Sequence, residues 1–216
     1  MRLAYTHLIW DFNGTLYDDV DAGIESANDL LAAHGLPIFS SRETYRETFG
    51  FPIVDYYRRL GFDFSRTPYT DLAVEWVAYY LERSRGSGVF DDVEKMLTRA
   101  KEQGISQWIL SATELGMLER QVELLGIRSW FDGLLGLDNI HAYSKAELGV
   151  RWIQANPDAR VLLIGDTDHD AEVAAAMGVD CALVARGHQN RKKLETCQAV
   201  AVVDSLTALS EILFDD

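Results

Sequence analysis

The chain has 216 residues, of which 48% are hydrophobic, and its 34 acidic and 20 basic side chains give a net charge of −14. The apolar share excludes a disordered chain, and the length suffices for one large domain or two small ones. The acidic balance argues against partners such as nucleic acid or acidic membranes, and two cysteines without metal or redox spacing favour a cytoplasmic protein.

Short apolar runs alternate with helical patterns along most of the chain. The first run is Leu8-Ile9-Trp10, and further runs lie at residues 108–110, 134–135, 161–164, 181–184 and 200–203. The runs do not alternate polar with apolar residues, which is typical of strands that helices cover on both faces. The alternation of strands and helices from residue 91 onward predicts an α/β fold with a Rossmann-like, doubly wound parallel sheet.

Residues 18–85 differ from the rest because they contain no strand-like run. Val74, Val77, Ala78 and Leu81 share one face of a predicted helix, and the "RGSG" stretch at residues 85–88 is typical of a linker. We therefore predict an all-helical cap domain at residues 18–85. It is inserted after the first strand of an α/β core domain formed by residues 1–17 and 86–216.

Polar residues stand where several of the predicted strands end. Asp11 follows the first strand, Ser111 follows residues 108–110, and Asp166 follows residues 161–164; Lys145 opens a later helix. Ligands of open parallel sheets bind at the carboxyl ends of the strands. We therefore expect these four side chains to converge at one edge of the sheet.

Each of these residues also has a purely structural explanation. The Asn-Gly dipeptide after Asp11 is a strong hairpin signal, although the following residues do not alternate like a returning strand. Asp166, Thr167 and Asp170 have the composition of a helix cap. Ser111 is equally compatible with a cap, and Lys145 with an exposed lysine in a first helical turn.

Four motifs together resemble those of the haloacid dehalogenase-like hydrolases. They are "DFNGTL" at residues 11–16, "ILSAT" at 109–113, Lys145, and "GDTDHD" at 165–170, and they occur in the order of the family. The helical insert lies where one subgroup carries its cap, and phosphoglycolate-phosphatase-like members look most similar. The resemblance implies a metal-dependent phosphatase with the fold predicted above.

The resemblance also implies roles for single residues. Asp11 would be the nucleophile that forms an aspartyl-phosphate. Mg²⁺ would be the cofactor, held by Asp11, the backbone carbonyl of Asn13 and Asp166, with Asp170 nearby, since hard oxygen ligands suit this ion. The substrate would be a small phosphorylated metabolite. The protein would be a monomer or a homodimer.

The remaining motif residues would surround the phosphoryl group. Ser111, together with backbone N–H groups near Gly14 and Ala112, would hold the phosphoryl oxygens, and Thr15 belongs to the same loop. Lys145 would neutralise charge on Asp11 and on the transferred group. Phosphoryl transfer depends mainly on such positioning and charge.

Asn13 departs from the family motif, which has a second aspartate at this position. That aspartate protonates the leaving oxygen and then activates water, and an amide does neither. We therefore expect either a slow phosphatase selective for good leaving groups, such as acyl phosphates, or a regulatory protein that binds Mg²⁺ and phosphate without turnover. A metal-independent dehalogenase fits less well, because Asp166 and Asp170 would supply metal ligands.

The insert offers candidate substrate contacts in residues 47–61. Phe49, Phe51 and Pro52 are expected to wall an apolar pocket. Arg46, Arg58 or Arg59 would be available for a second anion, although exposed arginines on a helix are the commoner case. We expect at least one of Tyr56 and Tyr57 to lie at a surface or an interface, because the two cannot both face the core. For His169 we expect a surface position, and phosphate contact by the loop Arg186-Gly187-His188 remains a weaker alternative.

Overall fold

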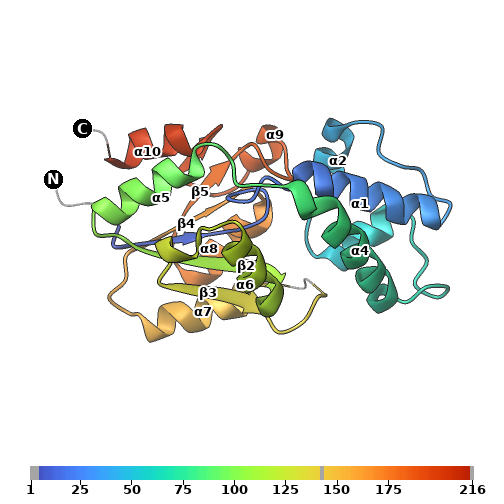
Figure 1. The fold of residues 1–216 in the computed structure, drawn as a ribbon, viewed down its shortest axis with the longest axis horizontal. Coiled ribbons are helices and arrows are strands. Elements are labelled where there is room, and N and C mark those ends of the chain that lie inside the picture. Colours follow the sequence, from blue (N-terminus) through green and yellow to red (C-terminus); the bar gives the residue numbers. More distant parts are fainter. Residues whose placement is uncertain (1–4, 142–143, 215–216) are drawn as a thin grey trace.

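A computed structural model describes residues 5–141 and 144–214, and a six-stranded parallel sheet lies at its centre (Figure 1). The order of strands across the sheet is β3-β2-β1-β4-β5-β6. Their bounds are β1 His7–Trp10, β2 Ser106–Glu114, β3 Gly133–Leu137, β4 Val161–Gly165, β5 Asp180–Val184 and β6 Ala201–Val203. This order confirms the predicted doubly wound sheet and places its switch point between β1 and β4.

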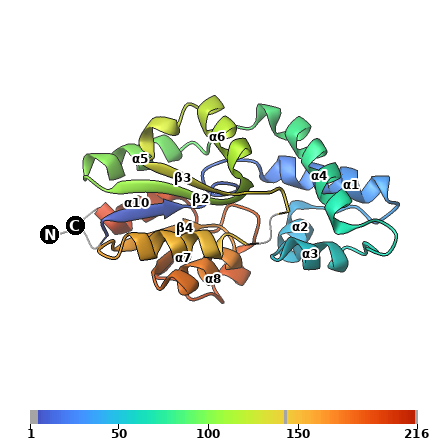
Figure 2. The same ribbon diagram turned by 90° about the horizontal axis from the view of Figure 1, so that it is seen from below.

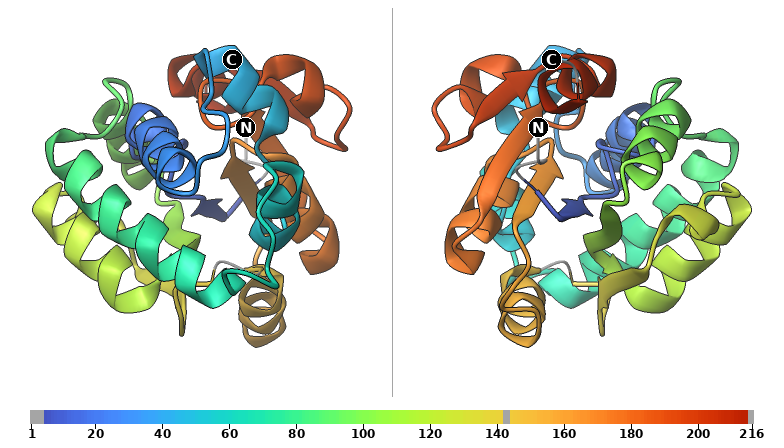
Figure 3. Two further views of the ribbon diagram at one scale, coloured as in Figure 1. Left: turned by 90° about the vertical axis from the view of Figure 1, so that its right-hand side faces the viewer. Right: turned by 90° about the vertical axis from the view of Figure 1, so that its left-hand side faces the viewer.

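Helices cover both faces of the sheet (Figures 2 and 3). One face packs on α5 (Val93–Glu102), α6 (Leu115–Leu124) and α10 (Leu206–Phe214). The other packs on α7 (Ala146–Ala155), α8 (Asp168–Met177) and the short α9 (Arg191–Leu194). Leu8 and Trp10 face the first layer and Ile9 the second, so all three are fully buried. Burial on both faces explains why β1 is continuously apolar.

A helical insert lies between β1 and β2, beyond the carboxyl ends of the strands (Figure 1). It contains α1 (Val20–Ala33), α2 (Arg42–Thr48), α3 (Ile53–Arg59) and α4 (Tyr69–Arg83), followed by a 3-10 turn at Ser84–Gly86. Many of its apolar side chains form clusters of their own, while Ala22 and Tyr80 pack into the layer of the sheet that includes α5 and α6. The inserted helices confirm the predicted architecture, whereas the division at residues 17/18 and 85/86 stays a prediction.

One local expectation about this region was confirmed and another was wrong. The chain after Asn13 turns through Gly14 at a φ of 69° and soon enters α1, so the dipeptide does not form a hairpin with a returning strand. In α4 the residues that pack inward include Leu72 and Tyr80, while Val74 is 57% exposed. The helix carries apolar residues on two faces, and the face with the larger aromatic rings is the buried one.

No helix within the described part of the chain is both long enough and apolar enough to cross a membrane.

Candidate active site

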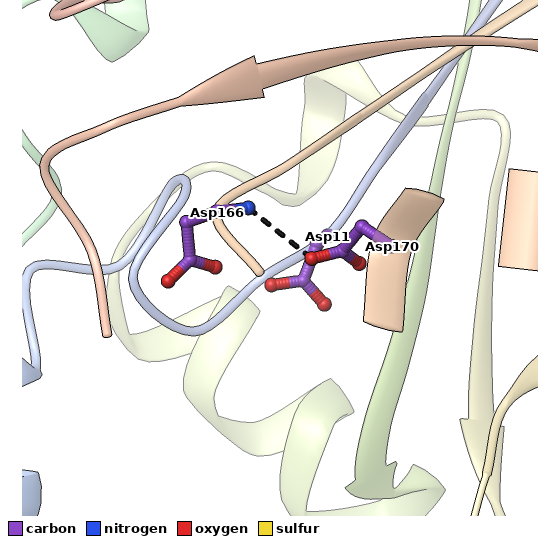
Figure 4. Close-up of side chains that lie close together, drawn as sticks. All are labelled: Asp11, Asp166 and Asp170. Carbon is purple, nitrogen blue, oxygen red and sulfur yellow. Dashed lines mark hydrogen bonds between the residues drawn. The ribbon is translucent and has the colours of Figure 1, made fainter. Parts of the chain in front are cut away.

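Three buried aspartates meet at the carboxyl edge of the sheet (Figure 4). Asp11 follows β1, Asp166 follows the neighbouring β4, and the N–H of Asp11 donates to the carbonyl of Ile164 at 2.7 Å. Asp170 comes from the first turn of α8. One oxygen from each carboxylate lies within 4.8 Å of the others. Adjacent parallel strands that end side by side therefore create the predicted acidic cluster.

Asp170 serves two structural purposes at once. Its Oδ2 accepts from the Thr167 N–H at 3.0 Å and from the Thr167 hydroxyl at 2.7 Å, which completes a capping box at the start of α8. Its Oδ1 lies 2.7 Å from Nζ of Lys145. The helix-cap explanation is thus correct for this residue, and the same side chain still contributes to the cluster.

Lys145 is a buried cation, not an exposed lysine. It lies at the N-cap of α7, is 2% exposed, and its Nζ contacts Asp11 Oδ1 and donates to the carbonyl of Leu110 at 3.0 Å. Burial alone would lower the pKa of Lys145, but the charges of Asp11 and Asp170 raise it above its ordinary value. The ammonium group therefore stays protonated and partly neutralises the cluster.

The three aspartates carry more negative charge than Lys145 alone neutralises. Burial raises the pKa of Asp11 well above its ordinary value, and burial likewise raises the pKa of Asp166 to about 6. In Asp170 burial acts in the same direction, but the charge of Lys145 outweighs it and lowers the pKa. Three carboxylates facing one ammonium make a site that a further cation would stabilise.

The oxygen cluster fits a hard divalent cation such as Mg²⁺ in its chemistry and its space. All of its side-chain donors are carboxylate oxygens, which such ions prefer. Two glycines leave room for the carboxylates. A Cβ at Gly187 would lie 2.0 Å from Oδ2 of Asp166, and a Cβ at Gly165 would lie 2.1 Å from Cγ of Asp170. The close approach of backbone to carboxylate is possible only without side chains at these positions.

The second strand end adds hydroxyl and backbone groups. Ser111 and Ala112 line the same cavity as the aspartates, together with Asn13 and Lys145. The hydroxyl of Ser111 donates to Oγ1 of Thr113 at 3.1 Å and accepts from the Thr113 N–H. Ser111 is therefore a buried part of the site's wall, where the expectation placed it.

Gly14 and Thr15 lie behind the cavity, outside the residues that line it. The Gly14 N–H donates to Oδ1 of Asp19 at 2.8 Å, and the hydroxyl of Thr15 donates to Oδ1 of Asp166 at 3.1 Å. In this arrangement both groups orient carboxylates. Their expected contact with substrate phosphate stays a prediction.

Asn13 belongs to a buried network that sequence reasoning missed. Its Nδ2 donates to Oδ2 of Asp19 at 2.7 Å and to the hydroxyl of Tyr80 at 2.8 Å, while its Oδ1 accepts from Thr113 at 2.9 Å. The Tyr80 hydroxyl also donates to Asp19 at 2.6 Å. Asp19 is only 1% exposed, so a buried carboxylate stands directly beside the position where the family motif has its second aspartate.

His188 forms the other side of this network. Its Nε2 lies 3.4 Å from Oδ1 of Asp19, its Nδ1 lies 2.8 Å from the hydroxyl of Tyr45, and its N–H donates to Oδ2 of Asp166 at 2.6 Å. Burial opposes the charge on both partners, but the contact lowers the pKa of Asp19 and raises the pKa of His188. The loop after β5 therefore reaches the site through its histidine, while Arg186 instead pairs with Asp92 at 2.5 Å.

The family model described as haloacid dehalogenase-like hydrolase matches residues 8–184, which is most of the chain. The chain belongs to this family.

Curated relatives and solved structures agree with that membership. A phosphoglycolate phosphatase of Cupriavidus necator is 26% identical over 220 residues, covering 99% of this chain and 95% of its own length. A haloacid dehalogenase-like hydrolase from Streptococcus pneumoniae superposes with a TM-score of 0.81 at 18% identity, covering 97% of this chain and 98% of that one. Protein tyrosine kinase A of Mycobacterium tuberculosis superposes with a TM-score of 0.78 at 21% identity, with coverages of 97% and 98%. At these identities the structural likenesses establish the fold.

The site of this haloacid dehalogenase-like hydrolase opens into a cavity of about 160 Å³ between the sheet and the insert. Phe49 and Phe51 line it as expected. Tyr56 and Tyr57 are both 3% exposed, so neither lies at a surface, but both line this cavity between the sheet and the insert, which agrees with the expected interface position. The helix α3 is buried on two sides, because Tyr56 packs on Phe49 while Tyr57 packs on Phe62 within the insert.

One further expectation about the cavity wall needs correction. His169 is 6% exposed and stacks on Phe51 with ring centroids 4.5 Å apart, so it is not a surface residue. The insert closes over the first turn of α8, which no pattern near His169 indicates. Arg46, Arg58 and Arg59 are absent from the described residues that line the cavity; Arg46 donates to the backbone carbonyls of residues 186 and 187.

Proposed function

We propose that this chain is a Mg²⁺-dependent phosphatase that acts through an aspartyl-phosphate at Asp11. The observation that carries the proposal is the buried cluster of Asp11, Asp166 and Asp170 with Lys145 at the end of the first strand. Membership of the hydrolase family and the relative named as a phosphoglycolate phosphatase support it.

In the proposed reaction Asp11 attacks phosphorus with a carboxylate oxygen, and the bond from phosphorus to the leaving oxygen breaks. Lys145 holds Asp11 in place and keeps positive charge beside it, while Ser111 and the backbone N–H of Ala112 receive the phosphoryl oxygens. Mg²⁺, held by Asp11, Asp166, the Asn13 carbonyl and indirectly Asp170, would supply charge that favours ionised Asp11 and neutralises the phosphoryl group. Water then attacks the phosphorus, which releases phosphate and regenerates the Asp11 carboxylate.

The amide at position 13 limits which leaving groups suit this reaction. It has no acidic proton for the leaving oxygen, and a positioned acid or base is commonly worth about 10²–10⁴-fold in rate. The buried Asp19 next to it is held as an anion by Gly14, Tyr80, Asn13 and His188, which makes it a poor proton donor. We therefore propose selectivity for leaving groups that depart without protonation.

Hydrolysis of acetyl phosphate tests the function. We expect Mg²⁺-dependent release of phosphate from the wild type, no release above background from Asp11→Asn, and wild-type rates from the exposed control Asp158→Asn. Intact-mass and peptide mapping should come first, because conversion of Asn13 to aspartate in a fraction of the sample would add activity. Equal rates for wild type and Asp11→Asn would refute the proposal.

A catalytically inactive phosphate-binding protein is the second candidate, and the saturated hydrogen bonding of Asn13 favours it. That function predicts Mg²⁺-dependent binding of inorganic phosphate without turnover of acetyl phosphate. Calorimetric titration of phosphate next to the hydrolysis assay distinguishes the two candidates.

A further inference from the structure

The cavity that leads away from Asp11 is walled by aromatic rings. The insert lines it with residues of α3 and α4 and of the segment before α3, namely Phe49, Phe51, Ile53, Tyr56, Tyr57, Tyr69, Trp76 and Tyr80. Several of these rings contact one another edge to face or stacked. Phe49 and Tyr56 have centroids 5.3 Å apart and meet at 67°, while Trp76 and Tyr80 stack at 4.8 Å. Such a wall favours a flat, apolar group.

The described part of the same wall provides no lysine or arginine that is free to pair with a second anionic group on a substrate, and its His188 is already engaged by Asp19 and Tyr45. Among the described residues that line the cavity, Lys145 is the one lysine and there is no arginine. Lys145 is already engaged by Asp11 and Asp170. A carboxylate placed against the aromatic rings would lose its hydration without gaining a charged partner, which is strongly unfavourable.

The size of the cavity favours a small ligand. An apolar cavity of about 150 Å³ is known to hold one benzene molecule, and this one measures about 160 Å³, including the space beside Asp11 and Lys145. A single ring with its phosphoryl group at Asp11 therefore suits the cavity better than a nucleoside or a two-ring compound. The hydroxyl of Tyr56, which is buried and has no hydrogen-bond partner among the described residues, is available for a polar substituent on that ring.

We propose that the substrates of this site are aryl phosphates, an inference that rests on the proposed function. These compounds are phosphate monoesters of single-ring phenols without a second anionic group. Asp11 forms a bond to phosphorus while the bond from phosphorus to the phenolic oxygen breaks, and the electron pair leaves with the phenolate. Solvent protonates the phenolate, and water hydrolyses the aspartyl-phosphate to free Asp11 and inorganic phosphate. Phenols have a pKa of about 10, against about 15.7 for water and similar values for simple alcohols. The amide at position 13 and the aromatic wall therefore select the same class of compound for independent reasons.

The test compares four phosphates with Mg²⁺ present. Phenyl phosphate has the ring and a good leaving group, benzyl phosphate has the ring with an alkoxide leaving group, phosphoglycolate has a second anion, and acetyl phosphate has no ring. We expect kcat/KM for phenyl phosphate to exceed that for phosphoglycolate by about 100-fold or more. Benzyl phosphate should show a similar KM to phenyl phosphate but a much lower kcat. A value for phosphoglycolate equal to or above that for phenyl phosphate would overturn the proposal.

Binding provides a readout that does not depend on turnover. In Asp11→Asn with Mg²⁺, calorimetry should show phenyl phosphate binding at least about tenfold more tightly than phosphoglycolate, because the ring buries apolar surface. Equal affinities would contradict the assignment. This comparison requires no change to the cavity wall, so it decides the question even where wall variants fold poorly.

A matched pair of variants on α4 locates the ring. Ala73 lines the cavity, and its neighbour Val74 is 57% exposed on the outer face of the same helix. Ala73→Leu should lower the ratio of kcat/KM for phenyl phosphate to that for acetyl phosphate by about tenfold, and Val74→Leu should leave the ratio unchanged. An unchanged ratio in a folded Ala73→Leu protein would place the ring elsewhere.

The outcomes separate this inference from the proposed function. Acetyl phosphate tests the chemistry of Asp11 without involving the aromatic wall. If acetyl phosphate is hydrolysed and phenyl phosphate is not preferred over phosphoglycolate, the aryl assignment is wrong while the phosphatase remains. If acetyl phosphate is not hydrolysed, the proposed function fails, and the calorimetric comparison still reports on the ring site.

Discussion

Replacing Asn13 by aspartate would place two carboxylates against each other in a buried position. The Nδ2 of Asn13 lies 2.7 Å from Oδ2 of Asp19, and the substitution exchanges this donor for an oxygen. At that separation two unit charges repel by about 6 kcal/mol with an effective dielectric constant of about 20. Binding a proton at pH 7 instead costs about 4 kcal/mol for a group with an ordinary pKa of about 3.9. The pair is therefore expected to share one proton.

The sign of the pH dependence follows from that proton. The pKa of the pair in the folded state is raised above its value in the unfolded chain, so the loss of stability is absent below about pH 4 and grows as the pH rises toward the folded pKa. We expect Asn13→Asp to lower the free energy of unfolding by about 3–4 kcal/mol at pH 7 and by about 1–1.5 kcal/mol at pH 5. Urea denaturation followed by tryptophan fluorescence, with five tryptophans in the chain, measures both values.

Two further variants test the electrostatic reasoning. Asn139 donates to Asp138 at the same distance of 2.7 Å in an exposed position, so Asn139→Asp should cost less than about 1 kcal/mol. The exchange Asn13→Asp with Asp19→Asn restores one amide and one carboxylate and should recover most of the stability. The exchange should also raise hydrolysis of benzyl phosphate by about 10²–10⁴-fold, because position 13 then has an ionisable group. Equal losses at pH 5 and pH 7 for Asn13→Asp alone would refute the shared proton.

Three further predictions concern the acidic cluster and its loop. Lys145→Met should lower the free energy of unfolding by about 3–5 kcal/mol without metal, since buried carboxylates lose their partner, and added Mg²⁺ should recover part of that loss in urea titrations. Mg²⁺ at 100 times its Kd should stabilise the wild type by about 2.7 kcal/mol, and Asp166→Asn should remove most of that effect in thermal unfolding. Deamidation of Asn13 should be at least about tenfold slower in the folded protein than in urea by peptide mapping, because native hydrogen bonds hold its amide and the Gly14 N–H. Equal deamidation rates in both states would contradict that network.

Patterns local in the sequence were enough for much of the fold. The strands are short apolar runs because helices cover both faces, and parallel strands bring their carboxyl ends to one edge. The approach of Asp11, Ser111 and Asp166 to one cavity was therefore predictable from strand ends alone. Lys145 joined this set through its place at the start of a helix and its fit to the family motif.

Contacts between the insert and the sheet were not predictable in the same way. Asp19 resembles an ordinary acid before a helix, and its partner Tyr80 lies 61 residues further along the chain. The burial of His169 similarly depends on Phe51, which lies in the insert between α2 and α3. A side chain buried by contact between the insert and the sheet produces no periodic pattern in its own segment. The hydrogen-bond network around Asn13 consists of such side chains.

The hydroxyl of Tyr80 connects the insert to the loop that follows β1 through hydrogen bonds. It donates to Asp19 and accepts from Asn13, so α4 is tied to the loop that follows Asp11. Any displacement of α4 that widens the aromatic cavity must either break these two hydrogen bonds or pull residues 13–19 with it. Widening of the cavity and displacement of the loop that follows Asp11 are thus coupled through these two hydrogen bonds.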